Sequence, residues 1–215
     1  MREDEHTLRQ SIVDQCRWMN ASGLNQGTSG NISVRLGESM LITPSATPYE
    51  TMTGEMIAAM PLDRADGEWT GPLKPSSEWR FHRDILESRP ELGAIVHTHS
   101  VHATALSMAR KSIPPCHYMI GVFGGDDVRV ADYATFGTAE LSLNALRALE
   151  DRSACLLASH GMIACGRDLE QAMWRAVELE TLARQYILAL QAGGPVLLTK
   201  DEIAAARAKF SGYVR

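Results

Sequence analysis

The sequence feature that most restricts the possible folds is a short apolar run joined directly to a helical segment. Residues 93–96 are apolar, residues 97–99 read His-Thr-His, and residues 101–109 have helical spacing. An apolar run of this length that ends in polar residues is typical of a buried strand. The chain therefore contains a strand-turn-helix unit, which indicates an α/β protein.

The elements on both sides continue this alternation. Gly23 is suited to end a first helix, Asp168 to cap a long one, and Thr199 with Glu202 has capping-box spacing. We expect a central sheet covered by helices in one domain over residues 1–215, and the strand order stays open. Strands are expected at residues 31–34, 40–43, 128–131 and 154–158, and further helices at 8–22, 78–90, 139–149, 168–190 and after 199.

Composition and charge exclude several classes of protein. With 215 residues, of which 45% are hydrophobic, the chain can bury roughly 70% of its unfolded surface, enough for one domain. Its 26 acidic and 21 basic residues are interspersed, so no nucleic-acid partner is expected. A charged N-terminus and the lack of any apolar run near the roughly 18 residues of a membrane helix predict a cytoplasmic protein without a membrane partner. The four cysteines lack zinc-site or disulfide spacing and are expected to be reduced.

Histidines at the ends of two predicted strands are candidates for a metal site. His97 and His99 are two residues apart in a strand, so both imidazoles point to the same face. His160 follows the apolar run 154–158, and three imidazoles would leave one open position on a tetrahedral zinc ion. His102 lies three residues after His99, so a second possible set of metal ligands, with helical spacing, stays open. The remaining histidines are expected to be structural or exposed, namely His6, His82 and His117.

A metal ion with an open position is suited to aldol chemistry. It would polarise the substrate carbonyl and stabilise the enediolate that remains when a carbon–carbon bond breaks. Glu78, at a predicted helix start, is the candidate acid or base for proton transfer. Spacing alone favours equally that Glu78 only interacts with the N-terminus of its helix.

Three polar loops offer groups that bind phosphate without a basic patch. Residues 27–31 read Gly-Thr-Ser-Gly-Asn and present N–H groups just before a strand. Ser76 and Ser77 lie at a predicted helix N-terminus, which favours an anion, and Ser45 with Ala46 lies in a neighbouring loop. Each loop alone is explained by ordinary turn chemistry, but together they favour a phosphate site. The patterns of P-loops and of dinucleotide-binding folds are missing.

Seven segments of the chain form a specific pattern: residues 23–31 (GLNQGTSGN), 41–44 (LITP), 75–82 (PSSEWRFH), 97–99 (HTH), 113–120 (IPPCHYMI), 133–137 (YATFG) and 160–161 (HG). Together they resemble class II aldolases of the fuculose-phosphate type, in the aldolase/adducin fold group. The resemblance spans almost the whole chain and implies a three-layer fold with a central, mainly antiparallel sheet between helices.

The resemblance also implies a set of site residues. It implies Zn²⁺, with Mn²⁺ or Co²⁺ as alternatives, bound by His97, His99 and His160. Glu78 would be a further ligand or, once displaced by substrate, the acid or base. The implied phosphate ligands are Thr28, Gly30, Asn31, Ser45, Ala46, Ser76 and Ser77.

Two tyrosines and an assembly follow from the same resemblance. Tyr118 would donate a proton on the aldehyde side, in the site of a neighbouring subunit, and Tyr213 would help to close the site. The implied assembly is a homotetramer with active sites between subunits.

The implied reaction is retro-aldol cleavage of a small phosphorylated sugar to dihydroxyacetone phosphate and an aldehyde. Candidate substrates are L-fuculose 1-phosphate, 5-deoxyribulose 1-phosphate and 5-(methylthio)ribulose 1-phosphate. Ser45-Ala46 stands where fuculose-phosphate aldolases typically have Thr-Gly, and this leaves the aldehyde portion open.

Three other functions remain as alternatives. A 4-epimerase of a pentulose phosphate is disfavoured because such relatives usually carry Asp at the position of Glu78. A decarboxylase of a phosphorylated sugar acid is the second alternative. The third is a non-catalytic, adducin-like assembly module, which loss of the metal ligands would support, whereas this sequence retains them.

Overall fold

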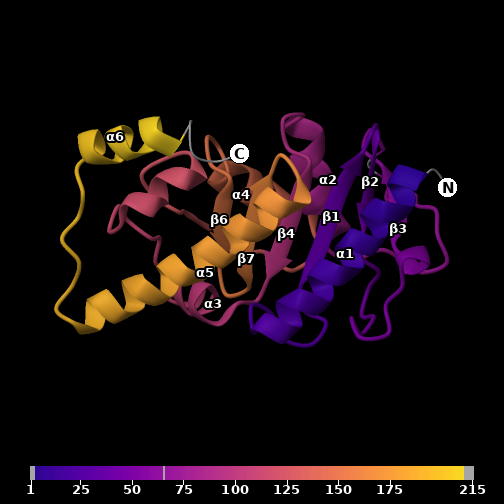
Figure 1. The fold of residues 1–215 in the computed structure, drawn as a ribbon, viewed down its shortest axis with the longest axis horizontal. Coiled ribbons are helices and arrows are strands. Elements are labelled where there is room, and N and C mark those ends of the chain that lie inside the picture. Colours follow the sequence, from indigo (N-terminus) through magenta and orange to yellow (C-terminus); the bar gives the residue numbers. More distant parts are fainter. Residues whose placement is uncertain (1–2, 65, 211–215) are drawn as a thin grey trace.

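A computed structural model describes residues 3–64 and 66–210, and within them seven strands form one sheet (Figure 1). The strand order is β3-β2-β1-β4-β7-β6-β5. Neighbouring strands pair antiparallel except β5 and β6, which are parallel, so the predicted mainly antiparallel sheet is confirmed. The strands are β1 (Asn31–Leu36), β2 (Ser39–Ile42), β3 (Ala58–Pro61), β4 (Ala94–Thr98), β5 (Val130–Ala131), β6 (Ala154–Leu157) and β7 (Gly161–Gly166).

Helices cover both faces of this sheet and give three layers. One core cluster joins α1, α3 and α5 to one face, and a second joins α2 and α4 to the other. The helices are α1 (Glu3–Ser22), α2 (Trp79–Ser88), α3 (Val101–Met108), α4 (Ala139–Ala148), α5 (Leu169–Gln191) and α6 (Lys200–Phe210), with 3-10 helices η1 (Gly54–Met56) and η2 (Tyr118–Phe123). None of the described helices combines the length and the apolar character that crossing a membrane requires.

Strand β4 shows why the apolar run from residue 93 is continuous. Val96 packs into the cluster of α1, α3 and α5, whereas Ile95 packs into that of α2 and α4. Because successive side chains alternate faces and both faces are covered, every position before the histidines must be apolar.

The predicted caps are confirmed. Asp168 accepts a hydrogen bond from the backbone N–H of Gln171 at 2.8 Å and begins α5. Thr199 and Glu202 form the reciprocal bonds of a capping box before α6. Gly23, with φ of 78°, follows the end of α1.

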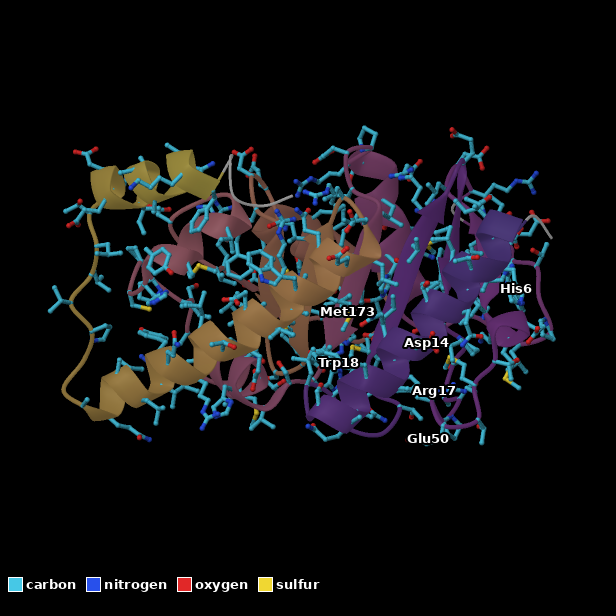
Figure 2. The ribbon with its side chains drawn as sticks, viewed as in Figure 1. His6, Asp14, Arg17, Trp18, Glu50 and Met173 are labelled. Carbon is cyan, nitrogen blue, oxygen red and sulfur yellow. The ribbon has the colours of Figure 1, made fainter. Side chains whose placement is uncertain are left out.

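The loop after β2, which carries Ser45 and Ala46, is tied to α1. Arg17, which is labelled on α1 in Figure 2, donates hydrogen bonds to the carbonyls of Tyr49 and Met52 at 3.1 and 2.9 Å. Ser45 and Ala46 of this loop line the same pocket as His99, which follows β4.

Strands β3 and β7 and the two 3-10 helices were not expected from the sequence. Strand β7 follows β6 after a turn in which Ser159 has φ of 53°, a left-handed conformation that usually signals itself by glycine or asparagine. Because the turn carries no such residue, the second strand of this hairpin was not separated from the first. Strand β3 lies at the sheet edge and is only four residues long.

Candidate active site

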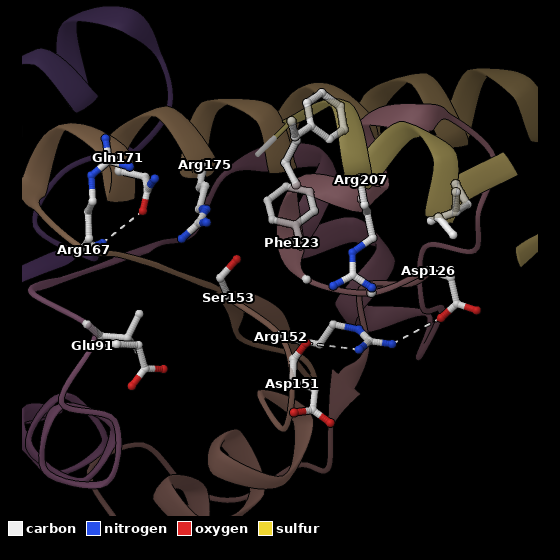
Figure 3. Close-up of a pocket in the computed structure, with 18 of the residues that line it drawn as sticks. Glu91, Phe123, Asp126, Asp151, Arg152, Ser153, Arg167, Gln171, Arg175 and Arg207 are labelled. Carbon is white, nitrogen blue, oxygen red and sulfur yellow. Dashed lines mark hydrogen bonds and ion pairs between the residues drawn. The ribbon is translucent and has the colours of Figure 1, made fainter. Parts of the chain in front are cut away.

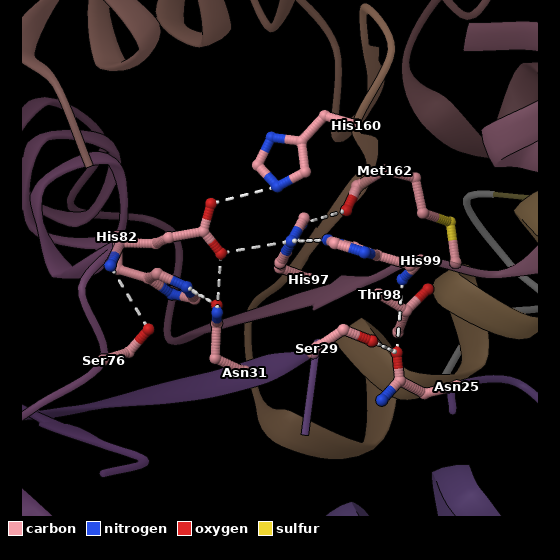
Figure 4. Close-up of polar contacts among 12 residues, drawn as sticks. Asn25, Ser29, Asn31, Ser76, His82, His97, Thr98, His99, His160 and Met162 are labelled. Atoms are coloured by element: carbon pink, nitrogen blue, oxygen red, sulfur yellow. Dashed lines mark hydrogen bonds and ion pairs between the residues drawn. The ribbon is translucent and has the colours of Figure 1, made fainter. Parts of the chain in front are cut away.

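The end of β4 and the turn between β6 and β7 bring three histidines together (Figure 4). Potential ligand nitrogens of His97, His99 and His160 all lie within 4.8 Å of one another. Their ring centroids are 4.8 to 5.0 Å apart. His102 is not part of this cluster, because its Nδ1 lies 2.7 Å from Glu180 Oε1 on α5. The structure therefore favours the strand-spaced set over the helix-spaced one.

The hydrogen bond of His97 defines which of its nitrogens can bind a metal. Nδ1 of His97 lies 2.8 Å from the carbonyl oxygen of Met162, which can only accept, so Nδ1 carries the proton. Burial lowers the pKa of His97 to about 3 despite the opposing effect of Glu78, so the ring is neutral near pH 7. Its Nε2 lone pair then points at Nε2 of His99, 3.1 Å away. Neutral imidazoles with converging nitrogens are the form that binds a divalent metal.

Glu78 lies just before α2 with its carboxylate against the histidines. Oε2 is 3.3 Å from His97 Nε2, and Oε1 is 3.1 Å from His160 Nε2, where the geometry is not that of a hydrogen bond. The side chain makes no capping bond to α2, which disfavours the purely helix-stabilising alternative. Burial raises the pKa of Glu78, but His97, His160 and the Asn31 amide outweigh it and lower that pKa below the usual range.

These donors fit a divalent cation. Three imidazoles within 4.8 Å of one another and one adjacent carboxylate match the ligands that zinc and similar ions prefer. Two glycines allow this packing. A Cβ on Gly161 would collide with the Thr98 carbonyl and lie 2.9 Å from His99 Cδ2, and one on Gly30 would lie 2.8 Å from the His97 carbonyl.

A cavity of about 370 Å³ opens beside the histidines, and we call it the histidine cavity. All seven residues predicted to bind phosphate line it, and none of the Lys and Arg residues that the structure describes does. Ala46 has φ of 51°, a backbone conformation that glycine adopts without strain. The lining is Thr28, Ser29, Gly30, Asn31, Pro44, Ser45, Ala46, Ser76, Ser77, Glu78, His99, Tyr133, Ala134, Phe136, Ser159 and His160.

Sequence reasoning missed two aromatic residues of this lining. Tyr133 and Phe136, in the loop between β5 and α4, are 59% and 64% exposed at the cavity. The available signal was an aromatic pair, three residues apart, in a segment with neither helical nor strand periodicity.

The predicted tyrosines lie elsewhere. Tyr118 begins η2, is half exposed, and stacks on Phe210 with centroids 6.1 Å apart, outside the histidine cavity of its own chain. Tyr213 lies outside the described residues. The roles of both remain predictions.

The other histidines also differ from one another. His6 is exposed, as expected, and His117 caps η2 by accepting from the Met119 N–H. His82 is completely buried, with Nδ1 2.7 Å from Ser33 Oγ and Nε2 2.5 Å from Asn31 Oδ1.

Known proteins share both the sequence and the fold. The family described as class II aldolase and adducin N-terminal domain matches residues 10–187. A 5-methylthioribulose-1-phosphate/5-deoxyribulose-1-phosphate aldolase of Rhodospirillum rubrum is 50% identical, over 96% of this chain and 92% of its own. An L-fuculose phosphate aldolase of Escherichia coli is 47% identical, over 98% and 97%. A solved L-fuculose 1-phosphate aldolase superposes with a TM-score of 0.92 at 37% identity, over 98% of both chains. The chain belongs to the class II aldolase and adducin family.

Proposed function

We propose that the chain is a divalent-metal-dependent aldolase that cleaves a ketose 1-phosphate to dihydroxyacetone phosphate and an aldehyde. The observation that carries the proposal is the convergence of three histidine nitrogens and the Glu78 carboxylate beside a cavity lined by hydroxyl and N–H groups. The activities named for the similar aldolases support the same reaction.

Zinc is the metal we propose, with Mn²⁺ or Co²⁺ as alternatives. Three histidines with one carboxylate are a donor set typical of zinc. When bound, the ion would supply a Lewis acid for the negative charge that develops on the substrate oxygens. His97, His99, His160 and Glu78 would hold it.

The substrate phosphate would bind in the same cavity through neutral donors. Ser76 and Ser77 precede α2, and Thr28, Gly30 and Asn31 precede or begin β1, so hydroxyl and N–H groups of two loops face one space. Helix N-termini and successive N–H groups bind anions without a cationic side chain.

Glu78 would transfer the proton to the reacting carbon of the dihydroxyacetone phosphate half. In cleavage, the hydroxyl on the aldehyde-forming carbon loses its proton and the adjacent carbon–carbon bond breaks. The electron pair of that bond stays on the dihydroxyacetone phosphate half, and the Glu78 carboxylate would first take up the proton that the hydroxyl loses and then deliver a proton to this carbon. Tyr118 of a neighbouring copy would exchange the aldehyde-side proton, and Tyr213 would help to close the site.

The aromatic lining supports an apolar end on the aldehyde half. Tyr133 and Phe136 offer exposed aromatic surface at the cavity. L-Fuculose 1-phosphate, 5-deoxyribulose 1-phosphate and 5-(methylthio)ribulose 1-phosphate all end in a methyl or methylthio group, which such surface accommodates.

We further propose a homotetramer and a cytoplasmic location. The exposure of Tyr118 away from its own histidine cavity supports an active site shared between copies. The four free cysteine thiols support a reducing compartment.

The test compares zinc-loaded protein with its Glu78→Gln variant on L-fuculose 1-phosphate and 5-(methylthio)ribulose 1-phosphate. Release of dihydroxyacetone phosphate is coupled to NADH oxidation. We expect cleavage by the parent protein and a kcat lower by roughly 10²- to 10⁴-fold in the variant. No triose phosphate from either sugar would overturn the proposal. Carbon dioxide release from a sugar acid would then favour the decarboxylase, and isomerisation without cleavage the epimerase.

A further inference from the structure

We propose that His82 is a positioning residue for Glu78 and that it acts through Asn31 as a fixed Nε2–H tautomer. The consequence for catalysis rests on the proposed function, whereas the tautomer and its effect on metal binding do not.

A chain of hydrogen bonds connects these residues (Figure 4). Ser33 Oγ lies 2.7 Å from His82 Nδ1, His82 Nε2 lies 2.5 Å from Asn31 Oδ1, and Asn31 Nδ2 lies 2.9 Å from Glu78 Oε2. Ser33 and His82 are completely buried and Asn31 is 4% exposed, so bulk water does not compete for these bonds.

The arrangement follows from the spacing of two elements. Ile32 and Val34 of β1 pack into the cluster of α1, α3 and α5, so Asn31 and Ser33 face the opposite layer, which contains α2. His82 lies four residues after Glu78, one helical turn along α2. Two strand residues therefore meet two residues of the helix start.

The chemistry of each atom fixes the direction of every bond. The Glu78 carboxylate only accepts, so the Asn31 amide nitrogen faces it and the Asn31 carbonyl faces His82. That carbonyl also only accepts, so His82 Nε2 carries a proton. Burial lowers the pKa of His82 to about 3, so the ring is neutral and Nδ1 must accept from the Ser33 hydroxyl.

This row of hydrogen bonds ends on the same Glu78 oxygen that lies 3.3 Å from His97 Nε2. It holds Oε2, while Oε1 stays beside His160 without an oriented hydrogen bond. The His82 ring stacks on Phe81 at 4.5 Å between centroids, and Phe81 contacts the edge of His97. Without the Nε2–H donor, the Asn31 carbonyl would lose its partner, and only the bond from Asn31 Nδ2 to Glu78 Oε2 would still orient the amide.

The first arm of the test reads the tautomer in metal-free protein. Long-range ¹H–¹⁵N NMR distinguishes protonated from unprotonated ring nitrogens. We expect His82 with protonated Nε2 and unprotonated Nδ1 at pH 7. A proton on Nδ1 would overturn the proposal, whatever the enzyme's activity.

The second arm compares His82→Gln, which keeps an N–H donor toward Asn31, with His82→Leu, which removes it. Ser33→Ala is the matched control. It removes the hydrogen bond between Ser33 and His82 and leaves the contact between His82 and Asn31. We expect zinc affinity, measured by chelator competition, to fall by roughly 10- to 100-fold in His82→Leu and much less in the other two. Equal affinities in the two folded His82 variants would contradict the proposal.

The third arm is kinetic. His82→Leu should lower kcat by a larger factor than it raises KM for the ketose 1-phosphate, because Asn31 is the one proposed phosphate donor that the described hydrogen bonds link to His82. His82→Gln should recover most of the kcat. If the parent protein cleaves no sugar phosphate, the proposed function fails, and the tautomer and the zinc affinities still decide the role of His82.

Discussion

Two cavities lie at opposite ends of the same strands, and they are built from contrasting groups. The histidine cavity lies where β4 ends and β7 begins, whereas a larger cavity of about 930 Å³ lies before β4 and after β7 (Figure 3). We call this second one the arginine cavity. Its basic lining residues are Arg89, Arg152, Arg167, Arg175, Lys200 and Arg207.

Partners already surround several cations of the arginine cavity. Arg152 contacts Asp126 and Asp127 at 3.2 and 2.7 Å, and Arg175 donates to the Cys165 carbonyl at 2.7 Å. In the histidine cavity, by contrast, two imidazole nitrogens face each other at 3.1 Å. Three imidazoles and a carboxylate that converge on one another therefore identify the candidate active site better than volume or positive charge does.

The largest expected effect separates the two cavities directly. His97→Ala combined with His99→Ala should remove bound zinc and lower cleavage by at least about 1,000-fold, because Lewis-acid stabilisation contributes several kcal/mol. Arg207→Ala in the arginine cavity should leave the zinc content unchanged. Elemental analysis of purified protein and the triose phosphate assay measure both. Full zinc content in the double variant would show that the metal is not bound by His97 and His99.

A methyl group on one glycine in each cavity sharpens the comparison. Gly161→Ala should lower zinc affinity by roughly 10- to 100-fold, because the added Cβ pushes on the Thr98 carbonyl and the His99 ring. Gly125→Ala, whose Cβ would meet the Arg152 guanidinium, should disturb only the arginine cavity. Chelator competition on both variants would show the difference, and equal zinc affinities would argue against it.

The buried histidines next to the histidine cavity should also respond to pH differently from the arginines of the other cavity. Folding lowers the pKa of His97 and of His82 from 6.5 to about 3, mainly by burial. Below pH 6.5 the unfolded chain therefore binds protons that the folded chain excludes, and stability is lost as the pH falls toward 3. Each histidine should contribute up to about 1.4 kcal/mol per pH unit, whereas arginine contributes nothing in this range. Urea unfolding of metal-free protein and of His82→Leu, at pH 7 and 5.5, should show a shallower dependence in the variant.

The smallest expected effect concerns backbone strain. Ala46 lines the histidine cavity with φ of 51°, and Asp151 lines the arginine cavity with φ of 56°. Asp tolerates this conformation better than Ala. Ala46→Gly should therefore raise the free energy of unfolding by about 0.5–1 kcal/mol and Asp151→Gly by less. Urea unfolding measures both, and a larger gain at Asp151 would reverse the expected order.

Local rules of spacing explain how much of the site was predictable. The two-residue period put His97 and His99 on one face, and the polar loops around Ser45 and Ser76 were recognised by their donors. His160 was predicted to join them because it ends an apolar run.

What the sequence did not reveal depends on packing between distant segments. The role of His82 requires β1 to lie against α2, a pairing that no local pattern encodes. Tyr133 and Phe136 face the histidine cavity because a loop folds over the sheet end, and a loop has no period from which to infer a face. Strand β7 was not predicted because the turn before it has Ser159, and not glycine, in the left-handed conformation.

The most direct measurement is metal reconstitution of the chain. Protein stripped with a chelator would be given 5-(methylthio)ribulose 1-phosphate and L-fuculose 1-phosphate, before and after one equivalent of zinc, and triose phosphate release would be followed. We predict no release from stripped protein and restored release with zinc in the parent chain, but none in the His97→Ala/His99→Ala variant. Release that persists at full rate without metal would contradict a metal-dependent aldolase built on these histidines.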